Sequence, residues 1–176
     1  MSEHLPNPIV PDEFLGGVPV RESRAEYSEL AMPNDANPLG NLFGGKVMAL
    51  VDLSGSISAA RHARSSVVTA SVDNMNFLFP VRIGELVTCY SQVNRVFKTS
   101  MEVGVKVCVE NLRTGEIRHV SSAYLTFVAL DTHGKRIPIR PVIPETDDEM
   151  RRYEQALERR EFRLELKRRA LETRGE

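Results

Sequence analysis

A long apolar segment between residues 43 and 64 constrains the fold of this chain more than any other feature. Two adjacent glycines, Gly44 and Gly45, open the segment after a run of turn-forming residues, and no proline follows until Pro80. At ~1.5 Å per residue, a helix of this length is roughly 30 Å long, which is enough to cross a small domain. Apolar residues occupy most of its circumference, namely Val47, Met48, Leu50, Val51, Ile57, Ala59 and Ala60. We therefore predict a central helix that is buried on all sides.

Asp52 lies in the middle of this apolar helix. Leaving a buried carboxylate without a partner costs free energy. Asp52 therefore either accepts hydrogen bonds from Ser54, Ser56 or backbone donors, or faces solvent, or has a catalytic function. The glycines favour a catalytic function. The backbone N–H groups of Gly44 and Gly45 are not obstructed by side chains, and at the positive end of a helix dipole such groups bind an oxyanion or polarise a carbonyl. The spacing alone leaves a structural and a catalytic role for Asp52 open.

Gly44 and Asp52 are too far apart to act on the same atom within one chain. Eight residues of helix separate them by ~12 Å along the axis, whereas a donor and a base must each lie ~3 Å from the reacting atom. If the two groups cooperate, a second copy of the chain supplies Asp52. A two-fold axis would then create two such sites, each with one group from each partner.

The segments around the helix are typical of antiparallel strands. We expect a first strand at residues 25–32 and later strands at 67–79, 86–97, 101–110 and 117–130, with a hairpin turn at 111–115. The clearest alternation places Met101, Val103, Val105, Val107 and Val109 on one buried face. In the segment 67–79, the same alternation groups Thr69, Ser71 and Asp73 on one polar face. The pattern predicts an α+β fold in which an antiparallel sheet wraps around the central helix.

Both ends of the chain differ in character from this domain. Residues 1–22 are rich in proline and glycine and are expected to form an extended N-terminal arm, followed by the main domain at 23–140. Residues 141–176 form a charged C-terminal extension, in which a capping-box pattern at Thr146 to Glu149 opens a helix that ends near Thr173. This helix lies against its own domain or a neighbouring subunit, or it binds another protein.

Composition excludes several classes of protein. The 176 residues carry a formal net charge of −1, which indicates neither nucleic acid nor an anionic membrane as a partner. No stretch of 18 apolar residues and no secretory signal pattern is present in the sequence, so we expect a cytoplasmic protein. Cys89 and Cys108 lie in strand-like segments and are interpreted as buried small hydrophobic residues. The four histidines show no metal-ligand spacing, so no metal site is expected.

Two motifs carry a resemblance to a known family. Asn37-Pro-Leu-Gly-Asn-Leu-Phe-Gly-Gly45 precedes Asp52 by a short helical stretch, and Phe77-Leu-Phe-Pro-Val-Arg-Ile-Gly-Glu85 follows it. From about residue 25 to residue 136, the chain resembles the hotdog-fold acyl-CoA thioesterases of the cytosolic long-chain and bacterial YciA-like group. The resemblance implies the hotdog fold, hydrolysis of fatty acyl-CoA to fatty acid and coenzyme A, and a homodimer that assembles into a trimer of dimers.

The resemblance also implies roles for individual residues. Asn41 and Asp52 match the catalytic asparagine and aspartate of the family, and a single-repeat chain carries both. The family segment that lies near the coenzyme corresponds to Lys98, Thr99 and Ser100, and Arg64 is a further candidate for phosphate binding. No cofactor is implied beyond the coenzyme A of substrate and product.

Two other functions are compatible with the same fold. A hotdog dehydratase needs a histidine in the helix start, and none precedes His62 in this stretch. A non-catalytic acyl-CoA binding or sensing module would retain the pocket without a competent Asp52. The sequence has no Gly-x-Ser-x-Gly motif for a serine hydrolase. It leaves open the acyl-chain length, regulation by nucleotides or coenzyme A, the role of the C-terminal helix, and whether Asp52 acts as nucleophile or general base.

Overall fold

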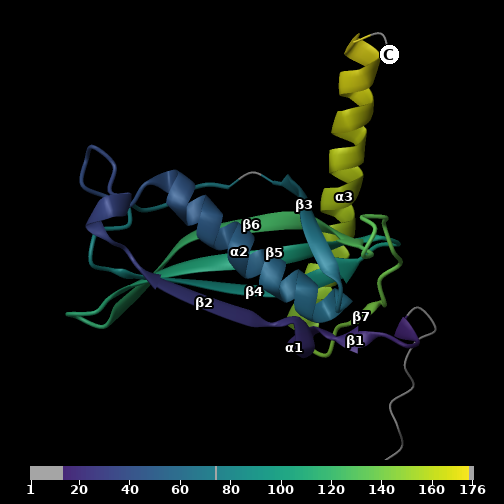
Figure 1. Cartoon of the computed structure of the whole chain (residues 1–176), viewed down its shortest axis with the longest axis horizontal. Coiled ribbons are helices and arrows are strands. Elements are labelled where there is room, and N and C mark those ends of the chain that lie inside the picture. Colours follow the sequence, from purple (N-terminus) through teal and green to yellow (C-terminus); the bar gives the residue numbers. More distant parts are fainter. Residues whose placement is uncertain (1–13, 74, 175–176) are drawn as a thin grey trace, which may run out of the picture.

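A computed structural model describes residues 14–73 and 75–174, and it consists of an antiparallel sheet with a helix on each face (Figure 1). The long helix α2 crosses one face of the sheet, and α3 begins on the opposite face and projects beyond it. This is the hotdog arrangement predicted from the sequence. The elements in chain order are β1 (Val18–Pro19), α1 (Val20–Ser23), β2 (Ala25–Leu30), the 3-10 helix η2 (Pro33–Asp35), α2 (Gly44–Ala63), β3 (Ser66–Val72), β4 (Leu86–Val96), β5 (Ser100–Asn111), β6 (Glu116–Leu130), β7 (Val142–Ile143) and α3 (Asp147–Arg174).

The main sheet has five strands in the order β2-β4-β5-β6-β3, and all neighbours are antiparallel. The predicted hairpin turn at 111–115 joins β5 to β6, with the N–H of Gly115 donating to the carbonyl of Asn111. A separate pair of two-residue strands, β1 and β7, is parallel. The strand β3 therefore occupies one edge of the main sheet, beside β6.

The core lies between α2 and the inner face of the sheet. All five apolar residues of the β5 alternation, from Met101 to Val109, are buried as predicted. A glycine on α2 permits close packing, because a Cβ on Gly55 would lie 3.1 Å from the ring of Phe127 on β6. These contacts place α2 directly against β5 and β6.

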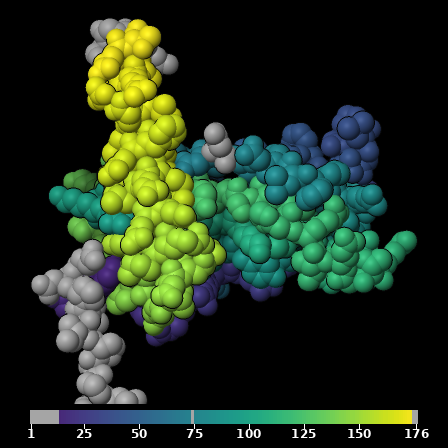
Figure 2. Space-filling model, turned by 180° about the vertical axis from the view of Figure 1, so that it is seen from behind, coloured from purple at the N-terminus to yellow at the C-terminus, as the bar shows by residue number. Residues whose placement is uncertain are grey.

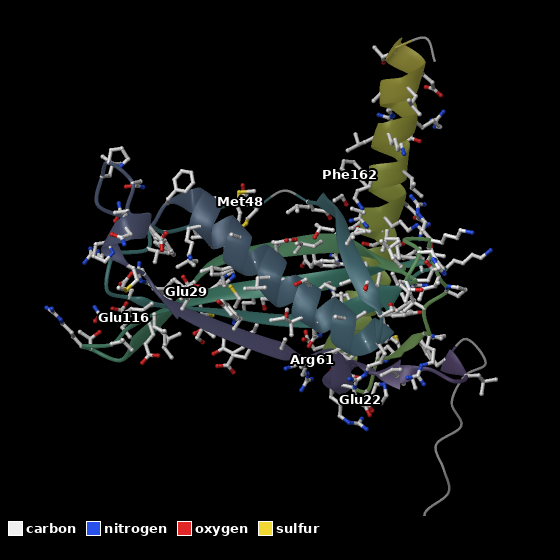
Figure 3. All side chains as sticks on the ribbon, in the orientation of Figure 1. Glu22, Glu29, Met48, Arg61, Glu116 and Phe162 are labelled. Atoms are coloured by element: carbon white, nitrogen blue, oxygen red, sulfur yellow. The ribbon has the colours of Figure 1, made fainter. Side chains whose placement is uncertain are left out.

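The prediction of a helix buried on all sides is wrong for the single chain. The side of α2 that faces the sheet is buried, but Met48 and Leu53 remain 48% and 42% exposed. Figure 3 shows Met48 on a part of α2 that no other element of the described residues covers. The helix has its predicted bounds and leaves an apolar side uncovered.

The strand predicted at 67–79 is shorter than its composition indicates. It ends at Val72, and the segment that follows keeps only isolated bonds to β6, such as the N–H of Leu78 to the carbonyl of Val120. A bulge between Thr69 and Ser71 interrupts the register with β6. Proline at position 80 cannot donate a hydrogen bond to a sheet, so it does not continue these bonds.

The predicted extended arm at 1–22 is wrong for part of its length. Residues 1–13 lie outside the described residues, but Val20–Ser23 forms a helical turn. Phe14, Val18 and Val20 are buried, so this end of the described chain is packed. Burial of these three apolar side chains explains order in a segment whose prolines and glycines suggested an extended arm.

The C-terminal helix α3 has the predicted bounds and covers part of the outer face of the sheet (Figure 2). As the capping-box pattern predicts, the hydroxyl of Thr146 accepts a hydrogen bond from the N–H of Glu149 at 3.2 Å. The carboxylate of Glu149 accepts from the N–H of Glu145 at 2.7 Å. Ion pairs from Arg159 to Glu102 and from Arg163 to Asp73 hold α3 on its own domain.

Candidate active site

The start of α2 forms one wall of a pocket of about 340 Å³. Asn37, Asn41 and Gly44 supply its polar groups, so the structure brings the predicted Asn41 and Gly44 together. The remaining lining is apolar and comes mainly from the turn before α2 and the segment after β3: Leu39, Leu42, Val47, Phe77, Leu78, Phe79, Pro80 and Val81. The pocket combines a few amide groups with an apolar wall, which is typical of a small-molecule site.

The amide of Asn37 is held in a fixed orientation. Its Oδ1 accepts hydrogen bonds from the N–H groups of Leu39 at 2.9 Å and Asn41 at 3.1 Å. Because the oxygen is used for the turn, the NH₂ group of Asn37 is the part available for a ligand. Among the described residues, the side chain of Asn41 forms no hydrogen bond, so nothing in the chain fixes its amide in the same way.

The glycines at the helix start differ in what they permit. A Cβ on Gly45 would lie 2.3 Å from the ring of Phe43, whereas a Cβ on Gly44 would meet the ring of Phe77 only at 3.7 Å. Gly45 makes room for Phe43, and Gly44 faces the pocket. The first N–H groups of α2 have no partner within the helix, so they are available to an anionic or polarised oxygen.

Asp52 is partly exposed and receives a short hydrogen bond from a threonine. The hydroxyl of Thr69 on β3 donates to Oδ1 of Asp52 at 2.6 Å. The expected partners bind elsewhere: Ser54 donates to Ser91 at 3.0 Å, and Ser56 donates to the carbonyl of Leu53 at 2.8 Å. Sequence reasoning missed Thr69, because its distance from Asp52 depends on how β3 lies beside α2.

Asp52 is not among the residues that line the pocket at the helix start. It lies about two turns further along α2, which places it ~12 Å from Gly44 along the axis. The structure of one chain therefore separates the predicted catalytic carboxylate from the amide groups of the pocket.

The predicted coenzyme-binding residues also fall in two places. Lys98, Thr99 and Ser100 form the tight turn between β4 and β5, where the N–H of Phe97 donates to the carbonyl of Ser100 at 2.7 Å. Ser100 lines a second groove, beside α3. Arg64 is exposed and ends α2 in the left-handed conformation with φ 53°, and it does not line either of these cavities.

An apolar surface surrounds Asp52 and the edge strand β3. Val68 and Val72 on β3 are 47% and 44% exposed, and the aromatic segment after the strand is more exposed still. Within the described residues, the outer edge of β3 pairs with no other strand. Its backbone groups and these side chains are thus available to a further strand and a further apolar surface.

The part of the chain that the structure describes contains neither a cluster of metal-binding side chains nor a membrane-spanning helix. No group of three or more His, Cys, Asp or Glu side chains is arranged to hold a metal ion in residues 14–73 and 75–174. None of the helices in these ranges is long and apolar enough to span a membrane. Cys89 and Cys108 are buried and unpaired, as predicted from their position in strands.

Comparison with known proteins identifies the class to which this fold and pocket belong. Residues 39–116 match the family model described as the thioesterase superfamily. The chain is 43% identical over 148 residues to the uncharacterized acyl-CoA thioester hydrolase YkhA of Bacillus subtilis, covering 84% of this chain and 86% of that protein. It is 34% identical over 138 residues to a cytosolic acyl coenzyme A thioester hydrolase of Rattus norvegicus, covering 77% of this chain and 36% of that longer protein. The chain therefore belongs to the hotdog thioesterase superfamily.

Solved structures agree with this membership. A hexameric acyl-CoA thioesterase superposes with a TM-score of 0.82 at 42% identity, covering 88% of this chain and 97% of that one. An acyl-CoA hydrolase of Staphylococcus aureus, solved with butyryl coenzyme A and coenzyme A, gives a TM-score of 0.80 at 33% identity, covering 90% of this chain and 98% of that one. The likeness includes most of each chain, so it extends beyond the residues of the family model.

Proposed function

We propose that this protein hydrolyses acyl-CoA thioesters in a site that two copies of the chain share. One observation carries the proposal: a pocket with fixed amide donors lies at the start of α2, and a threonine-bound carboxylate lies further along the same helix, outside that pocket. Hydrolysis needs both groups at one carbonyl, and a second chain related by a two-fold axis supplies the missing one.

The residues suggest separate roles in the reaction. The NH₂ group of Asn37 and the N–H of Gly44 stabilise the negative charge that develops on the thioester oxygen. Asp52 from the other chain accepts a proton from the attacking water, or it attacks the carbonyl itself to form an anhydride that water then cleaves. In both cases the C–S bond breaks, coenzyme A leaves as the thiolate and takes up a proton, and the acid is released. The apolar wall formed by residues 77–81 supports an aliphatic acyl group as the other part of the substrate.

We propose Asn37, rather than Asn41, as the amide that acts on the thioester. The fixed orientation of Asn37 supports this choice, and a comparison supports it further. Structures of three alanine variants of the Staphylococcus aureus hydrolase were solved, at an aspartate, an asparagine and a threonine. In that protein, the asparagine lies fifteen residues before the aspartate, and the threonine lies seventeen residues after it. In this chain, Asn37, Asp52 and Thr69 have the same two separations.

We further propose a homodimer, in which the edges of two β3 strands pair and the exposed apolar surfaces meet, and an assembly of three dimers. The relatives solved as hexamers support the larger assembly. Location in the cytoplasm and a place in fatty acid metabolism belong to the same proposal, supported by the rat relative described as cytosolic. No cofactor is required, because coenzyme A enters with the substrate.

The proposal is tested by assaying thiol release from a series of acyl-CoA esters. Asp52→Ala and Asn37→Ala should each lower kcat by ~10²-fold or more, because each removes a group that acts on the reacting carbonyl. Asn41→Ala is the matched control for Asn37 and should lose much less. Near-normal hydrolysis of every ester by Asp52→Ala would refute the assignment of the site.

Mixed dimers test whether the site is shared. When inactive Asn37→Ala and Asp52→Ala chains exchange subunits, one site of each mixed dimer carries both wild-type groups, so activity should return in part. Exchange shown by mass measurement without any recovered activity would place the site within one chain.

A further inference from the structure

A second groove, of about 370 Å³, lies between α3 and the sheet near the edge strand β3. Three basic residues of α3 form one wall: Arg160, Arg163 and Lys167. Three hydroxyl residues from different strands contribute to the other: Ser71, Ser100 and Thr126. The groove therefore joins a cationic wall to a wall of hydrogen-bond donors.

The three cations share one face of α3. At about 100° per residue, positions 160, 163 and 167 fall within an arc of about 60°. The guanidinium of Arg160 lies 4.1 Å from the centre of the Phe97 ring, which holds that side chain over the β4–β5 turn. The helical spacing and this contact direct the positive charges toward the turn that contains Ser100.

Positive charge is in excess in the groove. Arg163 is paired with Asp73 at 2.6 Å and lies 3.4 Å from a carboxylate oxygen of Glu102. In residues 14–73 and 75–174, neither Arg160 nor Lys167 forms an ion pair with a carboxylate. The hydroxyls of Ser71, Ser100 and Thr126 likewise form no hydrogen bond within these ranges. Two uncompensated cations and several free hydroxyl donors suit a phosphate ester, whose oxygens accept charge-assisted hydrogen bonds.

The bulge in β3 places this groove next to the candidate active site. Thr69 pairs with Phe127, which packs against Gly55 of α2, whereas Ser71 pairs with Thr126 on the other face of the sheet. The hydroxyl of Thr69 thus points to Asp52, and Ser71 two residues later lines the groove. Thr69 and Ser71 thus lie two residues apart on opposite faces of the sheet, so only a short stretch of β3 separates the groove from Asp52.

We propose that the groove binds the phosphate groups of the coenzyme A part of the substrate, and that Arg160, Arg163 and Lys167 of α3 are binding residues for them. This inference rests on the proposed thioesterase function. It gives α3, which lies outside the residues matched by the family model, a role in recognising the substrate.

The test compares two substrates that differ only in the phosphates and the nucleoside. The variant Arg160→Gln/Lys167→Gln removes the two cations that carry no ion pair. For this variant, kcat/KM for an acyl-CoA divided by kcat/KM for the matching acyl-pantetheine should fall roughly tenfold, because KM for the acyl-CoA rises. The control Arg168→Gln/Arg169→Gln also removes two charges from α3, but these residues are exposed and paired with Glu165, so its ratio should equal that of the wild type.

Two results would overturn the inference. Equal losses with both substrates would mean that the basic residues only support the fold, and an unchanged ratio would mean that the phosphates bind elsewhere. Adenosine 3′,5′-bisphosphate distinguishes substrate binding from an effector site: it should compete with acyl-CoA, and a change in kcat without competition would refute the assignment to substrate.

Calorimetry separates this inference from the thioesterase proposal. If the wild type binds coenzyme A but hydrolyses no ester, the proposed function fails. The groove is then judged by binding alone: coenzyme A should bind the double variant about tenfold more weakly than it binds the wild type, and equal binding would overturn the inference.

Discussion

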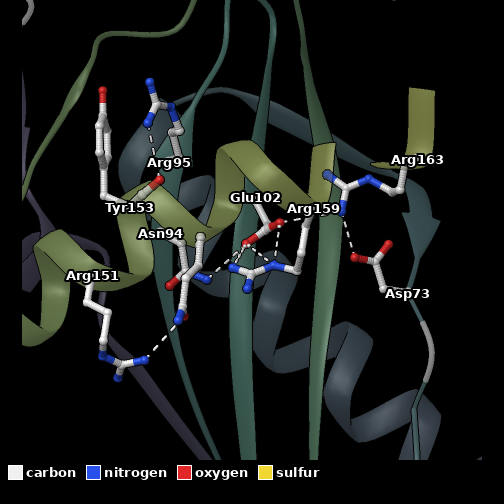
Figure 4. A network of polar contacts seen from close by, with 9 residues as sticks. Asp73, Asn94, Arg95, Glu102, Arg151, Tyr153, Arg159 and Arg163 are labelled. Carbon is white, nitrogen blue, oxygen red and sulfur yellow. Dashed lines mark hydrogen bonds and ion pairs between the residues drawn. The ribbon is translucent and has the colours of Figure 1, made fainter. Parts of the chain in front are cut away.

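A buried carboxylate on the outer face of the sheet gives the most quantitative prediction for stability. The side chain of Glu102 is 0% exposed and lies beneath α3. Arg159 contacts both of its oxygens, at 2.7 Å and 3.1 Å, and Asn94 donates to it at 3.1 Å. Arg163 adds a longer contact at 3.4 Å (Figure 4). We call these four residues the Glu102 cluster.

Arg159→Ala should destabilise the protein by about 2–3 kcal/mol. Removing one partner of a buried ion pair costs ~3–5 kcal/mol, because the other charge is left without compensation. Here Asn94 and Arg163 remain and reduce the loss, whereas the contact of Arg159 with the ring of Tyr124, at 3.7 Å, is lost as well. Burial lowers the pKa of Arg159, but the hydrogen bonds and the charge of Glu102 outweigh it and raise the pKa overall, which agrees with a favourable pair.

Urea unfolding at one fixed protein concentration measures this loss, because the stability of an oligomer depends on concentration. The double variant Glu102→Leu/Arg159→Met, which removes both charges, should be within about 1 kcal/mol of the wild type. Arg168→Ala, which breaks only exposed pairs of the same helix, is the control and should produce no measurable change. The reasoning is refuted if Arg159→Ala resembles this control, or if the double variant is less stable than the single one.

Two further predictions concern buried titratable groups. Burial raises the pKa of Cys89 to about 12, so a Cys108→Ser variant should not react with a disulfide reagent at pH 8 until it is unfolded; rapid reaction of the folded variant would contradict this. Burial also lowers the pKa of His62 below its usual 6.5, and the hydrogen bond to the Arg140 carbonyl, which raises the pKa, has a smaller effect. As pH falls, the unfolded chain therefore binds a proton at His62 before the folded protein does. Stability should therefore decline below about pH 6.5, and His62→Gln should reduce that slope by up to about 1.4 kcal/mol per pH unit; an unaltered slope would exclude His62 as the cause.

Sequence periodicity predicted the helices and strands that are determined by residues close to one another in the sequence. The bounds of α2 follow from a glycine-rich start and a continuous apolar run, and the buried face of β5 follows from strict alternation. The start of α3 follows from a cap and an acidic first turn. In each case, neighbouring residues determine the structure, so no knowledge of tertiary contacts is needed.

Two features of the candidate sites were beyond that reasoning. The amide of Asn37 is oriented by a turn whose hydrogen bonds become visible only in the structure, and the sequence motif directed attention to Asn41 instead. The sequence analysis assigned no binding role to the basic residues of α3, because nothing in their spacing reveals that β3 and the β4–β5 turn lie opposite them. The groove depends on packing between elements, whereas the hydrogen bonds of Asn37 join residues only two and four positions apart.

The bulge in β3 shows how one backbone irregularity changes a functional interpretation. Strict alternation assigns Thr69, Ser71 and Asp73 to one polar face, and that assignment is wrong. The register with β6 shifts after Thr69, so Thr69 faces Asp52 on the side of α2, whereas Asp73 faces Arg163 on the side of α3. A regular strand would have placed all three polar side chains on one side of the sheet. Because the bulge divides them, a single edge strand contributes both to the candidate catalytic carboxylate and to the candidate phosphate groove.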